Sequence, residues 1–357
     1  MKSSKITLTA ILTLLILLGA HYTPADTPAW GNANSAASAA RKRGEFVLAQ
    51  TLYNEVIEIQ MKELGPDRVE VAISLNNLAA SYQDQSMSSQ AEETYRQALA
   101  ILEKDPSQKT TVANTLDNLA ALFQDQGKDA EAEPLYTRAL GIWEQLENKD
   151  RTNEVISAAA LAGIYHAGRQ DAKAEPLYQR ALKLWSEQGM SEGVDAAGAM
   201  IQLAEIYRFR SDTVNAAPMY AHGLAIWEKT GQMESKEAVA AQAALGEIYR
   251  AEGKYAESEA LLSESLKTME EKLGPDHLQV AVALNNLALL YYCEGKYDAA
   301  EPLYKRSLEI REKSLGADNE VVLQTAQYYA AVLRQLGRNA DARRLEAKSA
   351  NNGASHL

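Results

Sequence analysis

The sequence predicts an all-α chain, built as a solenoid of about eight helix-turn-helix repeats. One position recurs every 41 or 42 residues along the chain. It is held by Tyr53, Tyr95, Tyr136, Tyr178, Tyr220, Leu262, Tyr304 and Glu346. Apolar residues follow the helical period on both sides of recurring turn glycines, and no strand pattern interrupts them. A fixed period of this length indicates stacked units in place of one closed core, and favours binding of other molecules.

The N-terminal segment differs from the rest of the chain. Lys2 and Lys5 precede an uncharged apolar run of fifteen residues, from Ile6 to Ala20. This length is short for a membrane-spanning helix and typical of the apolar core of a secretory signal. We therefore expect a signal peptide at residues 1–25.

Cleavage of this signal is expected near Ala25, which would make the protein exported, either periplasmic or secreted. The alternative is an uncleaved segment that anchors the chain to the membrane. Residues 26–35 are small and polar, and are expected to form a linker. The repeat array is expected at residues 36–349, and a flexible tail at residues 350–357.

The repeat unit is clearest between Leu284 and Ile310. Its first helix is predicted by apolar residues at i, i+3, i+4 and i+7, namely Leu284, Leu287, Ala288 and Tyr291. Gly295 then marks a turn. The second helix is predicted by an apolar face that holds Ala300, Leu303, Tyr304, Leu308 and Ile310.

The other copies keep this frame with small departures. The turn glycine is Gly44, Gly127, Gly253, Gly295 and Gly337. Gly168 takes this role one place early in repeat four, and Ser86 and Ser211 replace it in repeats two and five. Repeat one has a short first helix, Ser35 to Lys42, and repeat eight has Glu346 at the aromatic position, so both are interpreted as end caps. Four prolines are expected in the first turn of second helices, where a missing N–H costs little: Pro134, Pro176, Pro218 and Pro302.

The repeat pattern resembles the tetratricopeptide repeat. The family pattern of a large apolar residue, Leu-small, Tyr, Ala and a second aromatic reads here as Leu75, Leu78-Ala79, Tyr82, Ala91 and Tyr95. The long period is similar to that of kinesin light chains, down to the motifs at Leu75–Ala79, Ala132–Tyr136 and Lys272–His277. The resemblance implies a right-handed superhelical solenoid with a concave surface lined by the first helices. The cargo-adaptor role is not carried over, because the N-terminus indicates export.

Charge and cysteine content limit the partners and the packing. The net charge is −12, and becomes −14 when Lys2 and Lys5 leave with the signal. Such a chain repels phosphate backbones, so nucleic acid is not expected as a partner. The sole cysteine, Cys293, cannot form an intramolecular disulfide and is expected to be a partly buried packing residue.

The sequence holds no recognisable catalytic pattern. Its five histidines lack metal-ligand spacing, and neither a nucleophile elbow nor a phosphate-binding glycine loop is found. We therefore expect a non-enzymatic protein with no catalytic residues, no metal site and no cofactor. A hydrolase or transferase with an unrecognised site is the remaining alternative from another class.

The resemblance implies that the position five residues before the first-helix aromatic points into the concave groove. This position holds Asn77, Asn118, Gln202 and Asn286, and three of the four are preceded by Asn76, Asp117 and Asn285. An asparagine amide both donates and accepts, so a ladder of them can hold the backbone of an extended peptide. The alternative is that these amides bond neighbouring helix backbone or water.

Repeats five and six place arginines on the same surface. Glu205 and Arg208, and likewise Glu247 and Arg250, are spaced i, i+3, which favours salt bridges within each helix. Alternatively, Arg208 and Arg250 reach a carboxylate of a ligand. Three tryptophans that each follow a second-helix tyrosine by seven residues are expected to pack between repeats: Trp143, Trp185 and Trp227.

These features predict a non-enzymatic interaction scaffold of the cell envelope or secreted space, which binds a peptide or protein segment in its concave groove. The alternative is a structural component of an envelope or secretion assembly, which contacts partners through its convex face and ends. Membrane association is expected only if the N-terminal segment stays uncleaved. An exposed terminal repeat would allow homo-oligomers.

Overall fold

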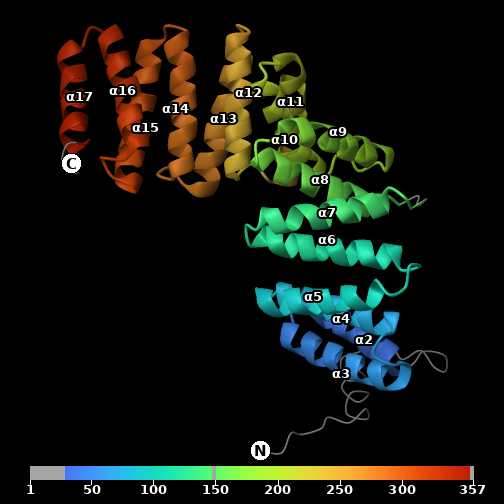
Figure 1. Ribbon diagram of the computed structural model, residues 1–357. Coiled ribbons are helices and arrows are strands. Elements are labelled where there is room, and N and C mark those ends of the chain that lie inside the picture. The colour runs from blue at the N-terminus through green and yellow to red at the C-terminus, as the bar shows by residue number, and fades with distance from the viewer. Residues whose placement is uncertain (1–28, 147–149, 354–357) are drawn as a thin grey trace, which may run out of the picture. The chain divides into compact units, whose positions relative to one another are not determined.

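The computed structural model describes residues 29–146 and 150–353, and within these ranges every regular element is a helix (Figure 1). The helices form two compact units, which divide between Leu184 and Trp185. The predicted signal peptide and residues 354–357 of the predicted tail lie outside the described residues. The all-α repeat architecture is therefore confirmed.

The helices alternate between first and second members of each pair. Unit one contains α2 (Ala29–Lys42), α3 (Phe46–Leu64), α4 (Val69–Gln83), α5 (Ser88–Leu102), α6 (Lys109–Asp125), α7 (Asp129–Trp143), α8 (Thr152–Ala167) and most of α9 (Asp171–Glu187). Unit two contains α10 (Val194–Phe209), α11 (Thr213–Thr230), α12 (Lys236–Ala251), α13 (Tyr255–Leu273), α14 (Leu278–Cys293), α15 (Tyr297–Leu315), α16 (Glu320–Gln335) and α17 (Asn339–Gly353).

Contacts in each unit run between near neighbours in the chain. Most contacts join a helix to the next one, as α4 to α5 in unit one and α14 to α15 in unit two. First helices of adjacent repeats also meet, α2 with α4 and α4 with α6 in unit one, and α12 with α14 in unit two. Second helices of adjacent repeats contact each other less. The first helices therefore line the more closely packed side of each unit.

The recurring tyrosines fill the space between the paired helices. The second-helix position is buried in seven repeats, at Tyr53, Tyr95, Tyr136, Tyr178, Tyr220, Leu262 and Tyr304. The fourth residue of six second helices is a buried alanine, which lets the paired helices approach closely: Ala49, Ala91, Ala132, Ala174, Ala216 and Ala300. Glu346 instead pairs with Arg334 at 2.6 Å near the surface, which fits its interpretation as part of an end cap.

The turn inside each repeat places one residue in the left-handed region of φ. Glycine holds this position five times, with φ between 69° and 77°. Ser86, Arg169 and Ser211 hold it in the other three repeats, with φ of 58°, 58° and 61°. The next residue then donates to a carbonyl five residues back, as Lys128 N–H does to Phe123 at 2.9 Å. The role predicted for Gly168 is wrong, because its φ is −78° and Arg169 is the left-handed residue.

Glycine substitution at the strained turns should stabilise the array. We expect Ser86→Gly and Ser211→Gly each to raise the free energy of unfolding by roughly 1 kcal/mol, because glycine has no Cβ to clash in the left-handed region. Urea unfolding measures the change. Gly127→Ala is the matched control, since no atom lies within 4 Å of its added Cβ and only the backbone is strained. A control that loses stability while neither serine variant gains any would contradict the explanation.

Several boundaries differ from the sequence prediction. The first helix begins at Ala29, so residues 29–35, predicted as a linker, are helical. The reason is that Ala33, Ala37 and Ala40 are buried on one helical face. At the other end α17 runs to Gly353, into the predicted tail.

The prolines and the cysteine also differ from expectation. Pro134 is the sixth residue of α7, beyond the four orphan N–H groups of a helix start, so it cannot donate to the carbonyl of Ala130. Pro176, Pro218 and Pro302 hold the same sixth position in their helices. Cys293 is exposed, not partly buried, because it lies in the last turn of α14 on the side that faces solvent.

Candidate functional site

In unit one the predicted groove residues lie on α4 and α6. Asn118 of α6 donates its side-chain amide to Asn76 Oδ1 of α4 at 3.2 Å, so these two residues link adjacent first helices. Asn77 is half-buried and makes no side-chain hydrogen bond among the described residues. The structure therefore brings Asn76 and Asn118 together, and leaves the amide of Asn77 open to a ligand.

Asp117 is engaged inside the protein. Its carboxylate accepts from Trp143 Nε1 of α7 at 2.8 Å and from the Ser157 hydroxyl of α8 at 2.7 Å. Burial raises the pKa of Asp117 to about 6, even though both hydrogen bonds favour the ionised form. This carboxylate ties three helices together. Its partners Trp143 and Ser157 could not be recognised from the groove pattern.

Asp117→Asn should remove part of the pH dependence of stability. Folded Asp117 holds its proton more tightly than the unfolded chain, so ionisation destabilises the fold as pH rises from about 4 to about 6. At 1.36 kcal/mol per pKa unit, the difference between 3.8 and about 6 amounts to about 3 kcal/mol once the carboxyl is fully ionised. Asparagine already occupies the equivalent positions 76 and 285. We expect the variant to gain about 2 kcal/mol over the parent between pH 4 and pH 7, measured by urea unfolding. A stability difference that stays constant with pH would refute this role.

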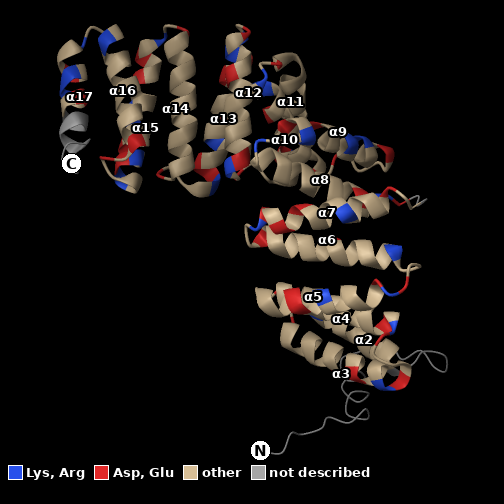
Figure 2. Ribbon diagram, in the orientation of Figure 1, with Lys and Arg blue, Asp and Glu red and all other residues tan. Residues whose placement is uncertain are grey.

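In unit two a cavity of about 370 Å³ gathers three of the predicted residues, Arg208, Arg250 and Asn286. They come from α10, α12 and α14, which are three successive first helices. The rest of this inner cavity is mainly apolar and includes Ala243, Ala244, Gly246, Leu262, Leu289 and Leu290. α14 supplies one wall and carries no charged residue along its length (Figure 2). Gln202 does not line the cavity, and neither does Asn285, whose buried Oδ1 has no hydrogen-bond partner in the described part of the chain.

The inner cavity exists because repeat six departs from the repeat pattern. Leu262 stands where most repeats have a tyrosine, and Gly246 stands where they have alanine, as at Ala288. Leu262 packs onto Gly246 so closely that an added Cβ would lie 3.2 Å from Leu262 Cδ2. Ala244 replaces the groove asparagine, whose equivalent is Asn286. The sequence signal was visible in Leu262, but its consequence for the neighbouring space was not.

The two arginines of the inner cavity differ in their partners. Arg208 donates to both carboxylate oxygens of Glu205, at 3.0 and 2.6 Å, so this predicted pair is confirmed. The predicted pair of Glu247 with Arg250 does not form, because the Glu247 carboxylate lies 3.9 Å from Arg208. Arg250 donates only to the Cys293 sulfur at 3.5 Å and has no carboxylate partner among the described residues.

The same change at Leu262 removes one potential hydrogen-bond partner from Arg250. In repeats two and three the tyrosine hydroxyl donates to the residue after the first-helix aromatic, as Tyr95 does to Gln83 at 3.1 Å and Tyr136 to Gln124 at 3.2 Å. Arg250 holds this position in repeat six, and Leu262 has no hydroxyl to offer. The cavity therefore combines an apolar floor with one cation that can pair with a ligand.

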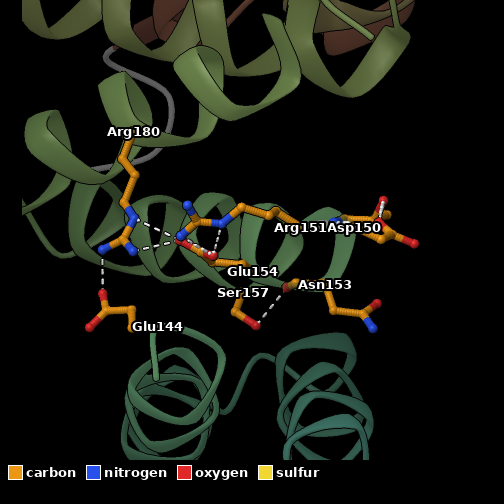
Figure 3. Close-up of polar contacts among 8 residues, drawn as sticks. Glu144, Asp150, Arg151, Asn153, Glu154, Ser157 and Arg180 are labelled. Atoms are coloured by element: carbon orange, nitrogen blue, oxygen red, sulfur yellow. Dashed lines mark hydrogen bonds and ion pairs between the residues drawn. The ribbon is translucent and has the colours of Figure 1, made fainter. Parts of the chain in front are cut away.

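Other clusters are structural. Trp227 packs with Ala238, Ala241 and Leu245 of α12, which confirms that it lies between repeats. The densest polar network surrounds Glu154, which is 3% exposed (Figure 3). Arg151 and Arg180 both donate to its carboxylate, and Arg180 also contacts Glu144. No cluster suited to holding a metal ion occurs in the part of the chain that the structure describes.

Comparison with known families identifies the repeat. The profile of the family described as "Tetratricopeptide repeat" matches residues 30–104, 111–184, 237–313 and 283–352. A second profile, described as "Tetratrico peptide repeat", matches residues 156–273. No curated protein sequence matches the chain.

Two solved structures with TM-scores above 0.5 give the same fold at low identity. A signal transduction ATPase from Pyrococcus horikoshii with a tetratricopeptide repeat sensor is similar at a TM-score of 0.60 and 15% identity, over 99% of this chain and 54% of that one. Pseudomonas aeruginosa pilF is similar at a TM-score of 0.52 and 14% identity, over 70% of this chain and 94% of that one. Repeats of a putative kinesin light chain from Podosopora anserina are similar at a TM-score of 0.47 and 23% identity, over 57% of this chain and 96% of that one. At these identities the likeness concerns the fold alone.

Proposed function

Because the chain belongs to the tetratricopeptide repeat family, whose members generally mediate protein–protein interaction, we propose that it holds a peptide or protein segment against its first helices. The observation that carries the proposal is the inner cavity, where Arg208, Arg250 and Asn286 meet over an apolar floor. Its volume of about 370 Å³ lies in the range of ligand sites. The fold is generally that of a non-enzymatic scaffold, and we propose the same here.

Each part of the cavity has a role in this proposal. The Asn286 amide donates and accepts, so it pairs with one peptide unit of an extended segment. The apolar floor receives an aliphatic side chain. Arg250 pairs with a carboxylate on the segment, because its guanidinium has no carboxylate partner of its own among the described residues. In unit one Asn77 is the amide free to act in the same way.

Refilling the cavity tests the proposal. Leu262→Tyr restores the side chain of the other repeats, and should fill the inner cavity without loss of stability. Affinity capture from envelope and secreted fractions would use residues 26–357 as bait, beside this variant and Arg250→Gln. A partner held by the parent chain and lost by both variants would support groove binding. A partner held equally by all three would contradict it and favour contacts through the second helices and the array ends.

We also propose that the protein is exported, on the strength of the N-terminal sequence. None of the helices in residues 29–146 and 150–353 is long and apolar enough to cross a membrane. We expect the mature chain to begin at Asp26, because the signal should be removed after Ala25. Intact-mass measurement of the protein from its native envelope and secreted fractions checks this. A chain that retains residues 1–25 in the membrane fraction would instead support an anchored form.

A further inference from the structure

Repeat six has a second cavity, on the side of its second helix. This outer cavity has a volume of about 490 Å³ and lies among α11, α12 and α13, which are neighbours in unit two (Figure 1). It shares no lining residue with the inner cavity. It is therefore a separate site, independent of the proposed function.

At three other junctions, the second helices of adjacent repeats are joined by an ion pair at one fixed place in the repeat. The cation stands two residues after the second-helix aromatic, and the carboxylate stands eight residues after the aromatic of the preceding repeat. Arg138 pairs with Glu103 in this way at 2.6 Å. Arg180 pairs with Glu144, and Arg306 with Glu270, in the same register. Each pair closes the outer side of one junction between repeats.

The junction between α11 and α13 lacks this cation. The arginine position is held by Glu264 and its partner position by Glu228, so two carboxylates stand where an ion pair closes those three junctions. Both line the outer cavity. Neither side-chain carboxylate has an ion-pair or hydrogen-bond partner among the described residues. A third carboxylate on the rim, Glu257, adds to the negative charge.

The floor of the outer cavity is apolar. Leu224 and Leu245 are buried there, and Met233, Tyr249 and Leu261 are partly buried against the same hydrophobic cluster. An occupant must therefore bring both an apolar surface and a cation. Lys272 is the one cation of the lining, and it is already paired with Glu234 at 2.9 Å.

We propose that the outer cavity binds an arginine side chain from a partner protein, with its guanidinium between Glu228 and Glu264 and a neighbouring apolar side chain on the floor. The arginine supplies the cation that Arg306 and Arg180 supply within the chain at other junctions. Arginine fits better than lysine because its planar fork can donate to two carboxylates at once. Its aliphatic stem can also pack against the leucines of the cavity floor.

A defined peptide tests this assignment. The probe is a fluorescent nonapeptide with a central Leu-Arg-Leu, and its control carries citrulline, which is neutral and nearly isosteric, in place of arginine. Fluorescence anisotropy with the full chain should show at least tenfold tighter binding of the arginine peptide, since two charge-assisted hydrogen bonds are at stake. Equal binding of the two peptides, or no binding of the arginine peptide at millimolar concentration, would overturn the proposal.

Variants separate the site from the general acidity of the chain. Glu228→Gln with Glu264→Gln should reduce the preference for arginine to less than twofold. Glu237→Gln with Glu309→Gln removes the same charge from exposed positions outside the cavity, and should leave the preference intact. Glu264→Arg should complete an ion pair with Glu228, abolish binding and leave the chain at least as stable. Equal losses in both glutamine pairs would reduce the effect to non-specific charge and refute the site.

Discussion

Replacing Arg311 with methionine is expected to stabilise the chain by about 3 kcal/mol, a value typical of replacing buried charges with well-packed apolar side chains. Arg311 lies in α15 and is only 6% exposed. Among the described residues its one hydrogen bond runs from Nη1 to the Thr325 hydroxyl at 2.5 Å, and its buried Nε has no partner there. Burial lowers the pKa of the guanidinium, which marks the cost of keeping the charge there.

The repeat itself indicates why methionine fits. Arg311 stands seven residues after the second-helix aromatic, and the same position elsewhere holds Gln60, Leu102, Trp143, Trp185, Trp227 and Met269. Met269 in the preceding repeat is fully buried. Guanidinium-chloride unfolding measures the gain. Arg311→Lys is the control and should lose stability, because a compact ammonium is more strongly hydrated than a guanidinium. A loss of stability in Arg311→Met would contradict the reading of Arg311 as an uncompensated buried charge.

Removing both arginines around Glu154 is expected to destabilise unit one by about 4 kcal/mol, because it leaves a buried carboxylate without its cations. Arg151 donates to Glu154 at 2.5 and 2.6 Å, and Arg180 donates to the same carboxylate at 3.1 and 2.5 Å (Figure 3). These bonds join α8 to the residue before it and to α9. Arg151→Met with Arg180→Met is the decisive variant, measured by denaturant unfolding.

A third substitution distinguishes the loss of the arginine contacts themselves from the cost of leaving the Glu154 carboxylate buried without a cation. Adding Glu154→Leu to the two methionines should recover most of the lost stability, because no charge then remains buried. Arg138→Met is the matched control, since its pair with Glu103 lies on the surface and should be worth less than about 1 kcal/mol. Failure of the leucine variant to recover stability would show that the network acts by packing and not by charge compensation.

Periodicity alone was sufficient to predict the fold. The recurring tyrosines and turn glycines predict helix pairs because both the buried face and the left-handed turn are local requirements. The turn of repeat four shows the limit: Gly168 looks like the turn residue, but the hydrogen-bonding register of the turn places Arg169 in the left-handed region. The hydrogen bonds of the whole repeat fix which residue takes a positive φ, and a glycine one position earlier does not change that residue.

The candidate sites were only partly predictable, because they depend on what surrounds each residue. The sequence pointed to Arg250 and Asn286 as surface residues of adjacent first helices. It did not show that Leu262 opens a cavity between them, since this depends on how much less space leucine fills than the tyrosine of the other repeats. Likewise, Asp117 looked like a groove residue until Trp143 and Ser157 were found to occupy its carboxylate. The role of Glu264 in the outer cavity becomes visible only once the ion pairs of three other junctions are known.

Most contacts join residues in the same repeat or in adjacent repeats, and this affects how the protein folds. Links between repeats join residues one period apart, as Gln83 to Asp125 at 2.9 Å and Arg41 to Asp84 at 2.5 Å. A segment can therefore close its contacts as soon as the next repeat has emerged, without waiting for the C-terminus. Chains with such local contacts fold quickly and can begin at any repeat. Synthesis and folding can thus proceed together, one repeat behind the other.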